Sequence, residues 1–168
     1  MRKALLIACT TAFAIACGAP ANTTNTNPPN STASNSSQPA AVSSPAAPAS
    51  PLSSLKASVG KTAVDIKLWD NKDVGPRLEK LMGADYATMK KFWGTESPIT
   101  ADGDVLMMSG CEPHNCGPNQ YVIFIDTAKD NINVVHIKNG VAKDYKEKGD
   151  IPLPKQFADE LSTLKSTK

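Results

Sequence analysis

The stretch YVIFIDTAKDNINVVHIKNGVAKDYK, residues 121–146, decides the fold. Its first five residues are all apolar, which is typical of a strand that is covered on both faces. The pair Asn139-Gly140 predicts a type I′ hairpin turn, because both residues tolerate a positive φ. The turn joins two strand-like runs, residues 132–137 and the more polar residues 141–146, which we expect at an edge. The stretch therefore predicts adjacent antiparallel strands joined by tight turns.

Helical patterns precede this stretch. Asp73 and Pro76 stand where an N-cap and a first-turn proline belong, and Gly83 follows where such a helix would end. Asp85 is in the position to cap a second helix, which Gly94 would stop. Tyr86 and the apolar residues after it fall on one side of this second helix, so we expect them to be core contacts.

A loop at residues 95–103 leads to a strand-like run at residues 105–109, and Pro154 opens a last helix after the sheet. Strands that follow one another through tight turns, with helices before and after, are typical of α+β domains. The sequence therefore predicts an antiparallel β-sheet flanked by helices, with a disulfide-closed loop protruding from the end of the sheet.

The N-terminus carries an export signal. Arg2 and Lys3 precede an apolar run that contains Cys9 and is too short to span a membrane. Residues 1–16 read as a lipoprotein signal peptide and Cys17 as the lipidated first residue of the mature chain. The expected location is the outer membrane, with the domain facing the periplasm. Cleavage after Ala21, which would release a soluble periplasmic protein, is the alternative.

Residues 17–55 are expected to be a lipidated, disordered tether, and residues 56–168 a single α+β domain. No charged or aromatic residue occurs between Gly18 and Ser54, so this segment lacks the apolar surface needed to offset its ordering entropy. All sixteen acidic residues lie at or after Asp65, and they balance the sixteen basic residues left after processing. A near-neutral domain offers no electrostatic footprint for nucleic acid.

Two cysteines close a six-residue loop before the central strand: Cys111-Glu112-Pro113-His114-Asn115-Cys116. Since Cys9 and Cys17 belong to the export signal, these two remain for each other in an oxidising compartment, where we expect them to pair. The disulfide and Pro113 would stiffen a turn that carries an imidazole. A turn stapled only for stability is the simpler reading.

The segment CEPHNC, with VLMMSG before it and QYVIFID after it, resembles the Cys-Lys-Pro-His-Asp-Cys loop of the bacterial inhibitor of vertebrate lysozyme (Ivy) family. A looser similarity extends from about residue 65 to residue 164. Glu112 and Asn115 depart from the family pattern, reversing one charge and removing another. The resemblance implies a non-catalytic lysozyme inhibitor with a c-type lysozyme as its partner. It also implies that Glu112, Pro113, His114 and Asn115 contact the target, with the imidazole entering the active-site cleft.

Other functions stay open. The chain has no Gly-x-Ser-x-Gly, phosphate-loop or dinucleotide motif, which argues against the corresponding enzymes, and no cofactor is expected. Cys111, His114 and Cys116 could offer three metal ligands, although no fourth ligand stands out. An envelope module that binds an endogenous muramidase, a lytic transglycosylase or a glycan is the second alternative. His136 reads as a structural histidine, and the sequence leaves open whether the chain forms a homodimer.

Overall fold

The computed structural model describes residues 50–166. The strands are β1 (Thr95–Glu96), β2 (Thr100–Asp102), β3 (Val105–Cys111), β4 (Asn119–Asp126), β5 (Asn131–Lys138) and β6 (Val141–Lys146). The helices are α1 (Gly75–Met82), α2 (Asp85–Phe92) and α3 (Lys155–Ser166), with two 3-10 helices, η1 (Pro51–Ser58) and η2 (Leu68–Asp70).

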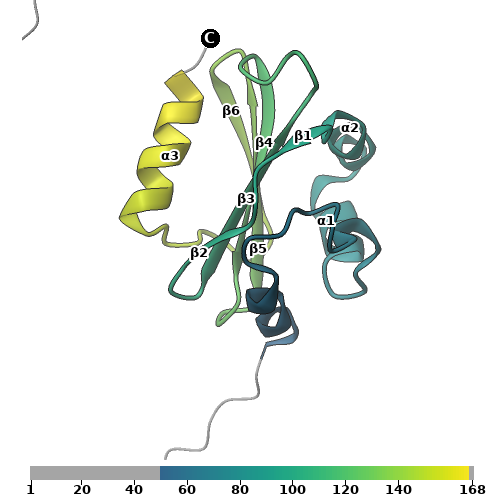
Figure 1. Ribbon diagram of the computed structural model, residues 1–168, viewed down its shortest axis with the longest axis vertical. Helices are drawn as coiled ribbons and strands as arrows, with labels where there is room; N and C mark the ends of the chain where they lie inside the picture. Colours follow the sequence, from purple (N-terminus) through teal and green to yellow (C-terminus); the bar gives the residue numbers. More distant parts are fainter. Residues whose placement is uncertain (1–49, 167–168) are drawn as a thin grey trace, which may run out of the picture. The chain divides into compact units, whose positions relative to one another are not determined.

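The strands form one antiparallel sheet in the order β1-β3-β4-β5-β6, with β2 also paired to β3. Figure 1 shows α3 on one side of this sheet and α1 and α2 on the other. The predicted α+β fold is therefore confirmed. Asn139 and Gly140 have φ angles of 51° and 77°, as a type I′ turn requires, and β6 lies at the edge of the sheet.

The sheet carries a hydrophobic core on each face, which explains why β4 is apolar at successive positions. Every residue of β4 is buried, and its side chains alternate between the two cores. The core under α1 and α2 includes Leu78, Met89, Trp93, Leu106, Met108, Tyr121, Ile123 and Ile125. The core under α3 includes Met107, Val122, Phe124, Ile137, Ile151 and Phe157.

Two expected helix caps are wrong. Helix α1 begins at Gly75 after Val74, so Asp73 lies outside it, although Pro76 does occupy the first turn. Helix α2 begins at Asp85 itself. The Asp85 carboxylate accepts hydrogen bonds from Lys143 Nζ at 2.7 Å and from the Tyr145 hydroxyl at 2.6 Å. This side chain therefore ties α2 to β6 in place of capping its own helix.

The segment expected to be a loop, residues 95–103, contains the short strands β1 and β2. Both pair with β3 through backbone hydrogen bonds, on the edge that β4 leaves free. Their residues are mostly exposed and polar, so no hydrophobic alternation marks them in the sequence.

The folded domain begins before residue 56. Leu52 and Leu55 of η1 are buried in the core under α1 and α2. Residues 51–55, assigned to the tether from composition, therefore belong to the domain. The predicted signal peptide, Cys17 and the rest of the tether up to residue 49 lie outside the described residues. Within residues 50–166, no helix is both long and apolar enough to cross a membrane.

A charged clasp closes the end of the sheet where β4 leads into β5. The Arg77 guanidinium donates from Nε and Nη2 to the Glu147 carboxylate at 2.7 and 2.6 Å, and from Nη1 to Asp130 Oδ1 at 2.7 Å. Lys148 Nζ lies 2.7 Å from the other oxygen of Asp130. We refer to Arg77, Asp130, Glu147 and Lys148 as the clasp, which fixes α1 to the ends of β5 and β6.

Candidate functional site

The cysteine loop connects β3 to β4 at the end of the sheet opposite the clasp. The last strand pair before the loop is Cys111 with Gln120. Cys111 and Cys116 form a disulfide with their Cα atoms 4.8 Å apart, which confirms the predicted pairing. Because this bond uses both sulfur atoms, the loop has no thiolate left for a metal, and the metal-binding alternative is removed there.

The crest of the loop is a β-turn. The backbone N–H of Asn115 donates to the carbonyl of Glu112 at 2.9 Å, which places Pro113 and His114 at the two central positions. Proline fixes a negative φ at the first of these positions, and His114 has a φ of 64°, the combination that a type II turn requires. A residue other than glycine rarely adopts such a φ, and such outliers cluster at functional sites.

Pro113 and His114 are exposed, and His114 makes no hydrogen bond or ion pair within residues 50–166. The structure therefore presents an imidazole at the tip of a covalently closed turn. The side chains of Glu112 and Asn115, unlike that of His114, form a hydrogen bond with each other. Glu112 Oε2 accepts from Asn115 Nδ2 at 2.7 Å. Target contact by these four residues remains a prediction.

Asn119, the first residue of β4, holds the base of the loop. Its buried side chain donates from Nδ2 to Glu112 Oε2 at 3.4 Å, and its backbone N–H donates to the Asn115 carbonyl at 3.0 Å. These hydrogen bonds from Asn115 and then Asn119 hold the pKa of the Glu112 carboxyl below its usual value. Asn119 is not among the predicted site residues, because an asparagine before an apolar strand gives only a weak signal.

The residues that directly follow α2 pack against the cysteine loop. The backbone N–H of Gly94 donates to the Cys111 carbonyl at 3.1 Å. A Cβ atom on Gly94 would lie 2.5 Å from Cγ of Pro113, so only glycine allows this approach. The indole of Trp93 packs in the same way over Gly110, where a Cβ would meet its ring at 2.2 Å. Trp93 is thus a core residue, as expected, and together with Gly94 it also packs against the loop.

His136 is a structural residue, as predicted. Its ring stacks on Tyr121 with centroids 4.1 Å apart and an interplanar angle of 11°, and its Nε2 lies 2.8 Å from Asn119 Oδ1. Burial lowers the pKa of its imidazole below the usual value. The two histidines therefore differ in environment, since His114 is exposed and His136 is half-buried beneath the loop.

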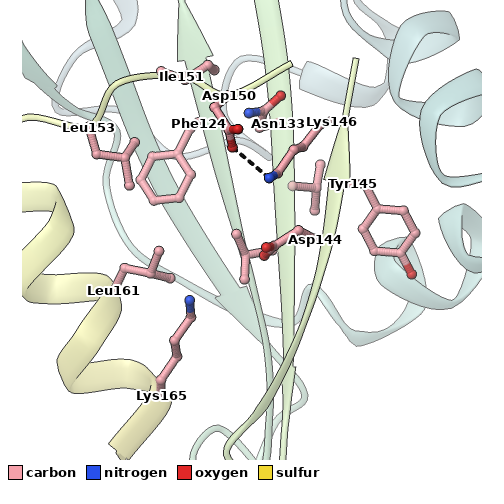
Figure 2. A pocket seen from close by; sticks show the side chains of 12 residues that line it. Phe124, Asn133, Asp144, Tyr145, Lys146, Asp150, Ile151, Leu153, Leu161 and Lys165 are labelled. Atoms are coloured by element: carbon pink, nitrogen blue, oxygen red, sulfur yellow. Dashed lines mark ion pairs between the residues drawn. The ribbon is translucent and has the colours of Figure 1, made fainter. Parts of the chain in front are cut away.

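A concave region lies between α3 and the sheet, away from the loop. Figure 2 shows Phe124, Leu153 and Leu161 around it, with an ion pair between Lys146 and Asp150 at its rim, 2.6 Å long. Its volume is about 110 Å³, below the ~300–1,000 Å³ of typical ligand pockets. In the part of the chain that the structure describes, no group of three or more His, Cys, Asp or Glu residues could hold a metal ion.

Comparison with known protein families gives one result. The family model described as "Inhibitor of vertebrate lysozyme (Ivy)" matches residues 73–167, more than half of the chain, and this range contains the whole cysteine loop. Comparisons with curated proteins and with solved structures give no match.

Proposed function

The chain belongs to the inhibitor of vertebrate lysozyme (Ivy) family, and from this premise we propose that it inhibits a lysozyme by inserting the loop of residues 111–116 into the active-site cleft. The observation that carries the proposal is His114, exposed at a φ of 64° on a disulfide-closed turn. Because the family is one of inhibitors, the proposal gives the chain an enzyme as its target and no catalytic activity of its own.

The mechanism follows from the chemistry of the two surfaces. Glycoside hydrolases such as lysozyme carry two carboxyl groups that flank the scissile bond. An imidazole that enters between them donates a hydrogen bond from each ring nitrogen when protonated, and the carboxylates favour that protonated form. The turn then occupies the space of the sugar chain, so substrate is excluded sterically.

The loop's rigidity raises its affinity. Binding that must order a flexible loop loses part of its contact free energy to that ordering. Here the disulfide, Pro113 and the Asn115 N–H bond to Glu112 order the turn before the target arrives. Close, desolvated charge pairs across an interface couple by about 1.5–7 kcal/mol, so one well-placed imidazole is enough to matter.

The experiment is inhibition by the His114→Ala variant. Truncating a hot-spot residue weakens binding by about 2 kcal/mol or more, which is roughly thirtyfold. Thermal stability should stay within ~0.5 kcal/mol of the parent, because His114 is exposed. His114→Asn is the matched control for the backbone, since asparagine tolerates a positive φ but lacks the imidazole, and it should inhibit as poorly as the alanine variant.

Two results would overturn this mechanism. If His114→Ala inhibits like the parent, the loop is a structural staple. If both His114 variants unfold, His114 is a structural residue that the fold requires, and its assignment as the group that enters the cleft is rejected.

The target class is a c-type lysozyme in this proposal. The assay is lysis of a peptidoglycan suspension by several lysozymes, each with and without the purified domain. Slowed lysis by c-type enzymes supports the proposal. Unchanged lysis by all of them would reject it and favour an envelope module directed at an endogenous muramidase, a lytic transglycosylase or a glycan.

We also propose that the mature protein is lipid-anchored at Cys17 in the outer membrane and faces the periplasm. Ala14-Ile15-Ala16 before Cys17 supports processing by a lipoprotein signal peptidase, and Gly18 in place of an aspartate favours forwarding to the outer membrane. The intact mass of the mature protein tests this. A free N-terminus at Asn22 without acyl chains would show a soluble periplasmic protein.

A further inference from the structure

The Glu112 carboxylate turns into its own loop. Oε2 accepts from Asn115 Nδ2 at 2.7 Å and from Asn119 Nδ2 at 3.4 Å. Backbone hydrogen bonds join the same residues. The Glu112 N–H donates to the Asn119 carbonyl at 3.4 Å, and the Asn115 N–H donates to the Glu112 carbonyl at 2.9 Å. We call Glu112, Asn115 and Asn119 the loop brace.

The brace continues into the sheet. An ionised carboxylate can only accept, so each asparagine must present its amide nitrogen to Glu112. The Asn119 amide oxygen then faces His136 Nε2 at 2.8 Å, and that nitrogen must carry a proton. His136 is itself fixed by stacking on Tyr121 with ring centroids 4.1 Å apart. Hydrogen bonds thus run from His136 of β5 through Asn119 to Glu112, which also accepts from Asn115 on the other side of the turn.

We infer that Glu112 and Asn115 are positioning residues that hold His114 in its target-binding orientation through the loop brace, and that they do not recognise the lysozyme themselves. This inference rests on the proposed function for its effect on inhibition. Their side chains flank the two central turn residues, Pro113 and His114, and each is engaged before any target binds.

The two positions that depart from the family pattern are the two whose side chains pair across the turn. A lysine at position 112 and an aspartate at position 115 would form the same cross-turn contact, with the direction of the hydrogen bond reversed. Asn119 can serve either arrangement, because rotating its amide by 180° exchanges oxygen and nitrogen. His136 would then accept with its unprotonated Nε2, in the other neutral tautomer.

A double-mutant cycle tests the inference. Asn115→Asp alone places two carboxylates side by side and should weaken inhibition about tenfold or more, as the loss of a hydrogen bond to a charged group does. Glu112→Lys alone should weaken inhibition less, because the Asn115 and Asn119 amides can rotate by 180° and present their oxygens to the ammonium. The double variant should recover to within a few-fold of the parent, because the reversed pair closes the turn again.

Two further variants separate positioning from contact. Glu112→Gln keeps an acceptor oxygen in the same place and should inhibit within a few-fold of the parent. Asp102→Lys, at an exposed position of β2 near the other end of the sheet, makes the same change of net charge as Glu112→Lys and should leave inhibition unaffected. If the double variant stays as weak as Asn115→Asp, or if Glu112→Gln is equally weak, Glu112 contacts the target directly and the inference is wrong.

Hydrogen exchange of the Asn115 and Asn119 backbone N–H groups in the free domain gives a readout that needs no lysozyme. Exchange should accelerate by about tenfold or more in Asn115→Asp and return toward the parent in the double variant. Unchanged exchange in Asn115→Asp would overturn the brace. If the parent inhibits no lysozyme but the exchange pattern holds, the proposed function fails while the brace stands.

Discussion

Replacing Arg77 by methionine measures what the clasp contributes to stability. Methionine keeps most of the apolar stem and removes only the guanidinium. That group makes two hydrogen bonds to the Glu147 carboxylate, one to the Asp130 carboxylate and one, at 2.8 Å, to the Asp130 carbonyl. The side chains of Arg77, Glu147 and Asp130 are 21%, 22% and 32% exposed, so the clasp is neither fully buried nor a surface pair.

The size of the effect follows from these contacts. Losing hydrogen bonds to charged groups costs about 1.5–3 kcal/mol when the partner is left unsatisfied. Here Asp130 keeps its ion pair with Lys148, and Glu147 keeps a hydrogen bond from the Ile132 N–H at 3.1 Å. The free energy of unfolding should therefore fall by about 2 to 3 kcal/mol. For a domain of this size the melting temperature should fall by roughly 8 to 12 °C.

Thermal and urea unfolding of the oxidised domain are the assays. The urea midpoint should fall without a change in slope, which indicates lost stability and not a changed unfolded state. Lys155→Met removes an exposed ion pair, whose two side chains are 87% and 64% exposed, and should change stability by less than ~0.5 kcal/mol. Inhibition at 25 °C should be unchanged, because the clasp lies at the end of the sheet away from the loop. A melting temperature of Arg77→Met within about 2 °C of the parent would refute the reasoning.

Two other predictions concern acid and the seat of the loop. Hydrogen bonds from Arg77 lower the pKa of Glu147 in the folded state, so the contribution of this carboxylate to stability is present above about pH 4.5, its ordinary pKa, and is lost as the pH falls through the folded pKa. As the pH is lowered from 7 to 3, the urea midpoint of Arg77→Met should therefore fall less steeply than that of the parent. Parallel curves would contradict this. Gly94→Ala should cost about 1 to 3 kcal/mol as overpacking and should also weaken inhibition, because its Cβ would lie 2.5 Å from Cγ of Pro113. Inhibition equal to that of the parent would show that the turn does not depend on the contact between Gly94 and Pro113.

The sheet could be predicted from sequence where local signals and burial agree. The apolar run of β4 and the Asn139-Gly140 turn each require only their own residues to be read. Strands β1 and β2 could not be found in this way, because they are short, polar and formed by pairing with the free edge of β3. The cap expected at Asp85 failed for a related reason, since its carboxylate is taken by Lys143 and Tyr145, residues far away in sequence.

The features of the cysteine loop also divide into those that local sequence predicts and those that depend on residues farther along the chain. The turn proline and the exposed His114 follow from six consecutive residues, and the disulfide follows from the same residues once Cys9 and Cys17 are assigned to the export signal. The inward orientation of Glu112 does not, because it depends on Asn119 across the loop and on His136 from a neighbouring strand. In the structure, the Glu112 carboxylate accepts a hydrogen bond from Asn115 within the loop, a contact that the sequence pattern does not indicate.

The separation of the loop and the clasp at opposite ends of the sheet has an evolutionary consequence. Substitutions at distant sites without shared partners combine almost additively, so a change at the crest of the loop leaves the clasp's contribution intact. Under the proposed function, lineages that meet a new lysozyme can therefore sample variants of the turn without crossing the stability threshold that limits most mutations. The constraint that persists is local, because the position of His114 admits only residues that accept a left-handed backbone.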